Sequence, residues 1–358
     1  MDRLSALPDC LLVPILHRLG LKEAAKAALF SKQWRFLWTN LPLYFCERIN
    51  GMEKIRRFVA HVDAVLAPLR DHPLGTLIFF FPYNKNLASD VDRWLDFAAK
   101  NKLKSFSLLL QHDFTVRPPQ NHTLPQFIYT ILSLTRLHLE RCTIQLPPQT
   151  AVDWPCLKQL SLVLVKSSQQ AFDKIATGCP LLESSHVGYC DGIERLEIGG
   201  RSFRRLTLTS YDSSDLKQIS MPYMRDLSIT VCFRGSRKKL QLENVQSLES
   251  ATICLNRSKS VNGSKRVPVD KVRCYTMELF KDLHHVENLS VDSTDSKNSI
   301  DWKPYMGDDL TCDLLHLKTI MFEGFQSLDL RGEPISTLAQ ILFKEKSNFG
   351  ENGDLQCE

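Results

Sequence analysis

Histidines, cysteines and basic clusters are the residues in this chain whose type and spacing could support chemistry. His284-His285 comes nearest to a metal-ligand cluster, but the ten histidines lack ligand spacing, and this pair fits better as the cap of a helix ending near Leu283. The sequence contains no glycine-rich nucleotide loop, no H-E-x-x-H and no G-x-S-x-G motif. We therefore expect no catalytic residues, no metal and no cofactor, because a hydrolase or transferase would need such a constellation.

The eleven cysteines run from Cys10 to Cys357 and include no C-x-x-C pair. An odd number without paired spacing argues against a disulfide framework and against a zinc cluster. We interpret these residues as buried thiols in a reducing compartment.

Two basic stretches are the remaining candidates for recognition. The first lies within residues 234–239, and the second includes Arg257, Lys259, Lys265 and Arg266. The simplest interpretation is that both are solvated loops. The alternatives are that these stretches bind an acidic or phosphorylated target, for which the four named residues of the second stretch are the candidates, or that they form a weak nuclear-import signal.

The composition limits the class of protein. A chain of 358 residues, 43% hydrophobic and 24% charged, can form a small domain and a large one. A net charge of +5 is too small to favour a nucleic-acid partner. No apolar run approaches the roughly 18 residues of a membrane span, and Pro14 interrupts the apolar run near the start, so we expect no signal peptide. These features predict a location in the cytoplasm, the nucleus or both.

Three short amphipathic helices are predicted within residues 7–41. Apolar residues at helical spacing define the three faces: Leu7, Leu11, Leu12, Ile15, Leu16 and Leu19; Leu21, Ala24, Ala25, Ala28 and Leu29; and Trp34, Leu37, Trp38 and Leu41. A unit of about 40 residues buries little surface by itself and usually needs a metal, a disulfide or a partner. Because the first two are not expected, a partner surface best explains so many large apolar groups.

The segment from Leu4 to Phe45 resembles a plant-type F-box. The matching residues are Leu7-Pro8-Asp9-x-Leu11-Leu12-x-x-Ile15-Leu16-x-x-Leu19, Leu21-Lys22-Glu23-Ala24-Ala25, Ser31-Lys32-x-Trp34-Arg35-x-Leu37-Trp38 and Leu41-Pro42. In that family the F-box docks on a Skp-type adaptor, which links it to cullin and RING subunits in an SCF ubiquitin ligase. The resemblance implies that the adaptor-binding residues are Leu7, Pro8, Leu11, Leu12, Ile15, Leu16, Leu19, Trp34 and Trp38.

Two alternatives to this docking surface stay open. Part of the apolar set must pack the helices on each other, and in an ordinary helical cap all of it would do so. Pro14 also departs from a regular helix, since a proline inside a helix removes a backbone hydrogen bond at a cost of about 3 kcal/mol. A kinked helix with weaker docking is therefore one possible outcome.

The body of the chain follows a repeated strand pattern. After a predicted helix over 55–69, a strand over 77–81 and a helix over 91–99, the template L-x-x-L-x-L recurs. Its fourth positions are Phe106, Leu137, Leu160, Ser185, Leu206, Leu227, Ala251, Leu289 and Ile320. From Leu137 to Ala251 the spacing lies within the range of about 20 to 29 residues found in leucine-rich repeats. Cys142 and Cys190 fall at strand exits where such repeats accept a buried Asn or Cys.

Three further strand-like segments lie about midway between these templates. They are centred on Leu196, Ile219 and Leu242, and they predict strands on both faces over residues 182–255. The helical pattern returns at Gln169 to Thr177, before Cys179-Pro180.

The order of motifs along the chain resembles plant F-box/LRR proteins of the FBD type. The later motifs are Leu124-Pro125 through Cys142, Gly178-Cys179-Pro180-Leu181-Leu182-Glu183 and Leu317-Lys318-x-Ile320-x-Phe322-x-Gly324-Phe325. The predicted fold class is α+β: a three-helix F-box at 1–46, linking helices and a first strand at 47–102, a leucine-rich-repeat solenoid at 103–346, and a polar tail at 347–358. The missing closing segment of that family predicts an exposed last repeat.

Two functional hypotheses follow from this organisation. The first is a non-catalytic substrate receptor of an SCF ubiquitin ligase, which binds the Skp-type adaptor at one end and a protein target on the repeat body. The second is a repeat scaffold that no longer docks on the ligase. Binding to a purified Skp adaptor distinguishes them.

Overall fold

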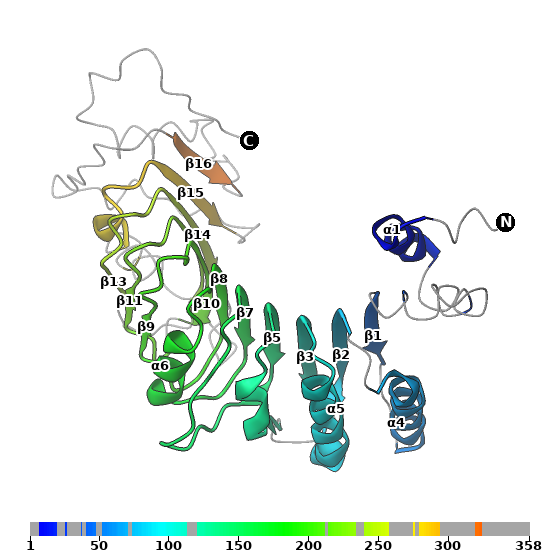
Figure 1. Cartoon of the computed structure of the whole chain (residues 1–358). Coiled ribbons are helices and arrows are strands. Elements are labelled where there is room, and N and C mark those ends of the chain that lie inside the picture. The colour runs from blue at the N-terminus through cyan, green and yellow to red at the C-terminus, as the bar shows by residue number, and fades with distance from the viewer. Residues whose placement is uncertain are drawn as a thin grey trace, which may run out of the picture. The chain divides into compact units, whose positions relative to one another are not determined.

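The computed structural model describes residues 7–19, 26, 37, 41–47, 52–70, 74–112, 120–211, 214–233, 240–257, 275, 279–293 and 319–323. The chain divides into two compact units, Met1–Leu182 and Glu183–Glu358. Both contain parallel β-sheet, and Figure 1 shows how strands follow one another within each unit.

The first unit contains a five-strand run of parallel sheet in the order β1-β2-β3-β5-β7. The strands are β1 (Pro42–Cys46), β2 (Thr76–Tyr83), β3 (Ser105–His112), β5 (Arg136–Glu140) and β7 (Gln159–Val163). One buried residue of each strand pairs in register across the run: Leu43, Leu77, Phe106, Leu137 and Leu160. The template positions of the repeat therefore form one continuous apolar row.

Helices cover one face of β1, β2 and β3 (Figure 1). These are α4 (Met52–Leu66) with the short 3-10 helix η2 (Ala67–Leu69), and α5 (Ala88–Lys100) after η3 (Lys85–Leu87). Trp94 of α5 stacks on Phe79 with centroids 5.2 Å apart and meets Phe58 of α4 edge-on at 5.8 Å. Its Nε1 donates a hydrogen bond of 2.9 Å to Asp63 of α4, so Trp94 ties both helices to β2.

The first unit also contains shorter elements around β5 and β7. It contains the two-stranded parallel sheet of β4 (His122–Thr123) and β6 (Cys142–Thr143), the 3-10 helix η4 (Gln126–Thr130) and α6 (Gln169–Thr177). The predicted helix over 169–177 is confirmed, and Ser168 caps it through a 3.2 Å bond that its Oγ accepts from the Ala171 N–H.

The second unit alternates between two parallel sheets. The larger contains β8 (Ser184–Gly188), β10 (Arg205–Tyr211), β12 (Asp226–Phe233), β14 (Ser250–Arg257), β15 (Asn288–Ser293) and β16 (Thr319–Glu323). The smaller contains β9 (Arg195–Glu197), β11 (Gln218–Ser220) and β13 (Gln241–Glu243). The predicted half-period strands are thus confirmed, with Leu196, Ile219 and Leu242 paired in register.

The template positions also align across the larger sheet. Ser185, Leu206, Leu227, Ala251, Leu289 and Ile320 pair in one row, as their spacing predicted. The pairing keeps the same register across the longer sequence spacings before β15 and β16. This regularity supports the repeat interpretation in the described residues.

Strand exits in three repeats have the same local geometry. Arg141, Leu164 and Tyr189 each follow their strand by one residue and adopt φ values of 56°, 54° and 50°, in the left-handed region. A cysteine follows two of these turn residues: Cys142 follows Arg141, and Cys190 follows Tyr189. In each case the Sγ lies 3.5 Å from the carbonyl oxygen of the last strand residue, which is Glu140 for Cys142 and Gly188 for Cys190. Both predicted strand-exit thiols therefore occupy equivalent places; Cys142 is buried and Cys190 is half-buried.

Several predictions differ from the structure or lie outside its described residues. Cys46 and Cys156 are exposed, so burial is not general among the thiols. Residues 42–46, at the end of the predicted F-box, form the edge strand β1, because Leu43 and Phe45 alternate into the sheet core. The second and third F-box helices, apart from residues 26, 37 and 41, lie outside the described residues, as does the 347–358 tail.

Candidate functional site

Helix α1 (Asp9–Leu19) has two apolar rows with different environments. Leu12 and Leu16 are fully buried in a cluster with Leu37 and Leu41, against which Leu7 and Val13 pack. Leu11 is 52% exposed and Ile15 is 36% exposed. These two residues lie four apart, so they share one helix face. The helix therefore uses one row for its own core and presents a second apolar row outward.

The start of α1 is held by Pro8, whose carbonyl accepts hydrogen bonds from the N–H groups of Leu11 (2.9 Å) and Leu12 (3.3 Å). Pro8 itself is exposed. Pro14 lies inside the helix on an exposed position, and the helix runs as one element from Asp9 to Leu19 despite the missing N–H. The outward row on both sides of Pro14 thus remains on a single helix.

The predicted adaptor-binding residues divide into three groups. Pro8, Leu11 and Ile15 are exposed, Leu7 is partly buried, and Leu12 and Leu16 belong to the internal cluster. The side chains of Leu19, Trp34 and Trp38 lie outside the described residues. Helical spacing alone could not separate the inner row from the outer row, because both rows are apolar.

The predicted target-binding residues are not placed. Arg257 ends β14 with its side chain outside the described residues, and Lys259, Lys265 and Arg266 fall in the undescribed range 258–274. Their role stays a prediction.

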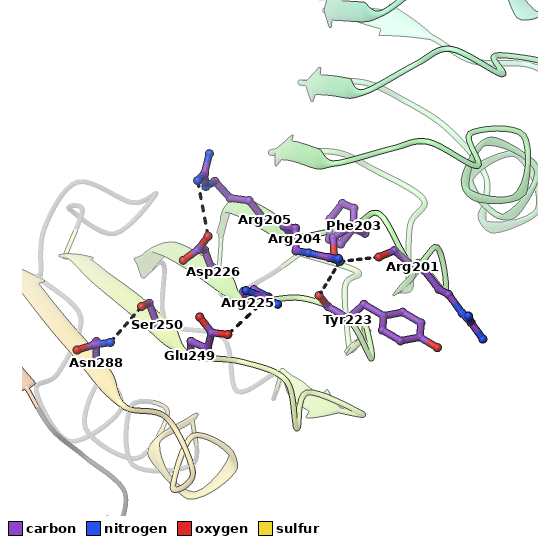
Figure 2. Close-up of polar contacts among 10 residues, drawn as sticks. All are labelled: Arg201, Phe203, Arg204, Arg205, Tyr223, Arg225, Asp226, Glu249, Ser250 and Asn288. Carbon is purple, nitrogen blue, oxygen red and sulfur yellow. Dashed lines mark hydrogen bonds and ion pairs between the residues drawn. The ribbon is translucent and has the colours of Figure 1, made fainter.

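A row of polar side chains marks the beginnings of the strands in the second unit (Figure 2). One carbonyl in each repeat accepts two successive N–H groups from the next: Arg204 O accepts from Arg225 (2.8 Å) and Asp226 (2.9 Å), and Arg225 O accepts from Glu249 and Ser250 (both 2.9 Å). These bonds fix the row at the spacing of parallel strands, about 4.8 Å.

Three arginines at this row form what we call the arginine patch: Arg204, Arg205 and Arg225. The Arg201 side chain points away from them (Figure 2). One terminal nitrogen of Arg204 donates to the carbonyl oxygens of Arg201 (2.6 Å), Phe203 (2.9 Å) and Tyr223 (3.4 Å). This bonding fixes the Arg204 guanidinium against the two turns that precede β10 and β12.

Arg205 and Arg225 each lie near one carboxylate, at a distance longer than a normal hydrogen bond. The Arg205 and Asp226 side chains approach to 3.6 Å, and those of Arg225 and Glu249 to 3.5 Å. All four side chains are about half exposed or more. The sequence signal for this patch was the pair of residues before each template marker, whereas our sequence analysis considered only basic runs in loops.

The face of the larger sheet opposite its buried residues carries hydroxyl groups. Thr207, Ser228 and Thr252 form one row in register, and Thr209 and Thr230 begin the next. These residues are half-buried or exposed. A surface of this kind can donate and accept hydrogen bonds and so bind polar groups of a partner.

Buried titratable groups in the first unit have structural partners. His122 lies 3.1 Å from the Asp92 carboxylate and 3.1 Å from the Tyr83 hydroxyl. Burial lowers the pKa of His122, with Asp92 partly opposing the shift, and burial raises the pKa of Tyr83 to about 12. Burial likewise raises the pKa of Cys142. Each group is held in its neutral form, which suits packing better than proton transfer near neutral pH.

Metal and membrane signals are not found in the part of the chain that the structure describes. No group of three or more His, Cys, Asp or Glu side chains there has the geometry to hold a metal ion. No helix in those same ranges is long and apolar enough to span a bilayer. The Nδ1 of His284 donates a 2.9 Å hydrogen bond to the Lys281 carbonyl oxygen, which agrees with its predicted capping role.

Comparison with protein families identifies two regions. Residues 91–289, more than half of the chain, match the model described as FBD-associated F-box protein At5g56370, LRR repeats. Residues 4–46 match the F-box domain. The two matches follow each other along the chain as the sequence motifs indicated.

Curated relatives from Arabidopsis thaliana agree with these matches. F-box/LRR-repeat protein At5g02910 is 29% identical over 304 residues, which cover 82% of this chain and 60% of that protein. F-box/LRR-repeat protein 13 is 29% identical over 269 residues, covering 70% and 58% respectively. F-box/FBD/LRR-repeat protein At1g13570 is 29% identical over 203 residues, covering 54% and 45%. The aligned part spans at most about 60% of the length of these relatives.

Proposed function

Since the chain belongs to the family of FBD-associated F-box proteins with leucine-rich repeats, we propose that it is a substrate-recognition subunit of an SCF-type ubiquitin ligase. The F-box docks on a Skp-type adaptor, which connects it to the cullin and RING subunits. The repeat body holds a protein target for ubiquitination, in the cytoplasm or the nucleus. The chain supplies positioning, and the bond-forming chemistry belongs to other subunits.

The observation that carries this proposal is the outward row of α1. Leu11 and Ile15 remain exposed although their neighbours Leu12 and Leu16 fill the internal cluster. A helix whose second apolar row has no partner within the described chain is suited to a groove on another protein, where i and i+4 side chains act as anchors. We therefore restrict the proposed adaptor contact on α1 to Pro8, Leu11 and Ile15, with Leu19, Trp34 and Trp38 as further candidates.

The register of the repeats supports the role of the body. Within each unit, buried template residues align on one side of the strands, and in the second unit small polar residues occupy the other side. We propose that the repeats form a solenoid and that the hydroxyl-bearing face is part of the surface that a target contacts. Such a surface can change its side chains without disturbing the apolar row behind it.

A double substitution in the outward row tests adaptor docking. We expect Leu11→Asp with Ile15→Asp to weaken binding to a purified Skp-type adaptor by at least about 100-fold, because two apolar anchors are replaced by charges that would be buried. The measurement is a pull-down followed by titration with the full-length chain. Thermal unfolding of the variant should match the parent, since both positions are exposed.

Leu132→Asp with Leu181→Asp is the matched control, because these leucines are 55% and 47% exposed and lie outside α1. This variant should bind the adaptor as the parent does. Unchanged binding by the α1 variant would reject the proposed contact, and a parent chain that fails to bind would leave a repeat scaffold that has lost docking.

A further inference from the structure

We propose that the arginine patch binds a segment of a protein partner that carries adjacent Asp or Glu side chains. The inference rests on the proposed function only in naming that partner as the ubiquitination target. The binding itself is a property of the second unit and can be measured without an adaptor. The patch consists of Arg204, Arg205 and Arg225, at the beginnings of β10 and β12.

The first argument is the unused donor capacity of Arg205 and Arg225. Each guanidinium touches its carboxylate at one point, at 3.6 Å and 3.5 Å, beyond the usual length of an N–H···O bond. A guanidinium fork can hold a carboxylate through two parallel bonds of about 2.8 Å. Because the Arg205 and Arg225 side chains are 65% and 56% exposed, an incoming carboxylate can take the better geometry.

The second argument is the fixed position of Arg204. Its three bonds to carbonyl oxygens of the turns use one terminal nitrogen, so the guanidinium is oriented before any partner arrives. Orientation in advance lowers the entropy that binding must overcome. Figure 2 shows Arg204 between the turn that carries Arg201 and the turn that carries Tyr223.

The third argument is the alternation of charge along the row, which selects the class of partner. Asp226 and Glu249 lie beside the arginines (Figure 2). Glu183 directly precedes β8, and its carbonyl accepts hydrogen bonds from the N–H groups of Arg204 and Arg205. These carboxylates repel the continuous phosphates of a nucleic acid or the dense phosphates of a membrane surface. Asp226 and Glu249 also form weak ion pairs with Arg205 and Arg225, which a carboxylate of the partner would have to replace. A short peptide with a few acidic side chains fits this spacing best.

Fluorescence anisotropy with the full-length chain and a labelled peptide of alternating Asp and Glu tests the proposal. The Asn/Gln version of the peptide is the uncharged reference. We expect Arg205→Gln with Arg225→Gln to weaken binding of the acidic peptide about tenfold at low salt. Arg136→Gln with Lys158→Gln removes the same charge from equivalent register positions in the first unit, and it should change the affinity by no more than about twofold.

A second variant separates recognition from a structural role of the arginines. Asp226→Asn with Glu249→Gln removes the internal competitors, so the acidic peptide should bind at least about threefold more tightly. Unchanged or weaker binding by this variant would overturn the inference. Equal losses of affinity in the Arg205/Arg225 variant and the Arg136/Lys158 variant would also overturn it. Preferred binding of single-stranded RNA or anionic lipid vesicles would assign the patch to another class. Adaptor binding should be the same in all these variants, so its failure bears only on the proposed function.

Discussion

His122 illustrates how a single buried side chain can set a property of the whole first unit. The imidazole is 2% exposed, faces Asp92 of α5 and Tyr83 of β2, and lies on β4 opposite Cys142 of β6. Burial lowers its pKa in the folded chain, while in the unfolded chain a histidine titrates near pH 6.5. The folded state thus binds fewer protons than the unfolded state as the pH falls.

The expected consequence is a loss of stability in mild acid. The contribution of neutral His122 is fully present above about pH 6.5 and is lost as the pH falls through the lower pKa of the folded state. In urea unfolding, the free energy of unfolding should fall less between pH 8 and pH 5 for His122→Gln than for the parent chain. Burial also lowers the pKa of His186, so part of the drop should remain. An identical drop in both proteins would show that His122 does not contribute.

The arginine patch shows what residue-level reading of the sequence can miss. Basic residues were sought as runs, and the runs fall in ranges that the structure does not describe. Arg204 and Arg225 are separated by 21 positions, and the parallel register of β10 and β12 brings them together, so that the Arg204 carbonyl accepts a hydrogen bond from the Arg225 N–H. A row of this kind is visible in the sequence only after the repeat period is used to align the strands.

Among the elements, α6 and the turn after it show why the Gly178-Cys179-Pro180 motif begins with glycine. Gly178 ends the helix, and a Cβ at this position would lie 2.3 Å from the Val152 carbonyl oxygen and 2.9 Å from the Val152 Cβ. The Gly178 carbonyl accepts a 3.0 Å hydrogen bond from the Trp154 N–H. Glycine is required at this position because two backbone segments pass each other closely.

Substitution of this glycine should therefore be costly. We expect Gly178→Ala to lower the free energy of unfolding by about 1 to 3 kcal/mol, since the backbone must move to admit the methyl group. The measurement is urea denaturation of the full chain. Gly199→Ala is the matched control, because a Cβ there meets no atom within 4 Å, and its effect should stay within about 1 kcal/mol in either direction. Equal effects of the two substitutions would refute the close-approach argument.

The strand register was the element-level feature most open to prediction. Buried leucines at a fixed spacing must face the same core, so the period indicated which residues pair, and Leu206, Leu227 and Ala251 do pair. The membership of β1 in the sheet was not predictable in this way. Its residues 42–46 follow the helical pattern of the F-box without a break, and the pairing of Leu43 with Leu77 depends on distant sequence.

Helical periodicity could not separate the two rows of α1, because it indicates which residues share a face and not what that face contacts. Leu11 and Leu12 are chemically identical neighbours, yet one is 52% exposed and the other is buried. Only packing against Leu37 and Leu41 distinguishes them.

For the whole molecule, the proposed function combines an F-box that docks on an adaptor with a repeat body that binds a target. The chain matches both the F-box model and the repeat model, and its alignment to F-box/LRR-repeat protein At5g02910 covers 60% of that protein. A receptor needs both, because ubiquitin transfer depends on holding a target near the ligase.

Isothermal titration calorimetry of the full chain with a purified Skp-type adaptor tests this central claim most directly. The account predicts a one-to-one complex with a dissociation constant below about 1 µM and a negative heat-capacity change, because the apolar row of Leu11 and Ile15 leaves water. Absence of binding heat at several temperatures, with no co-elution at about 100 µM of each protein, would contradict the account.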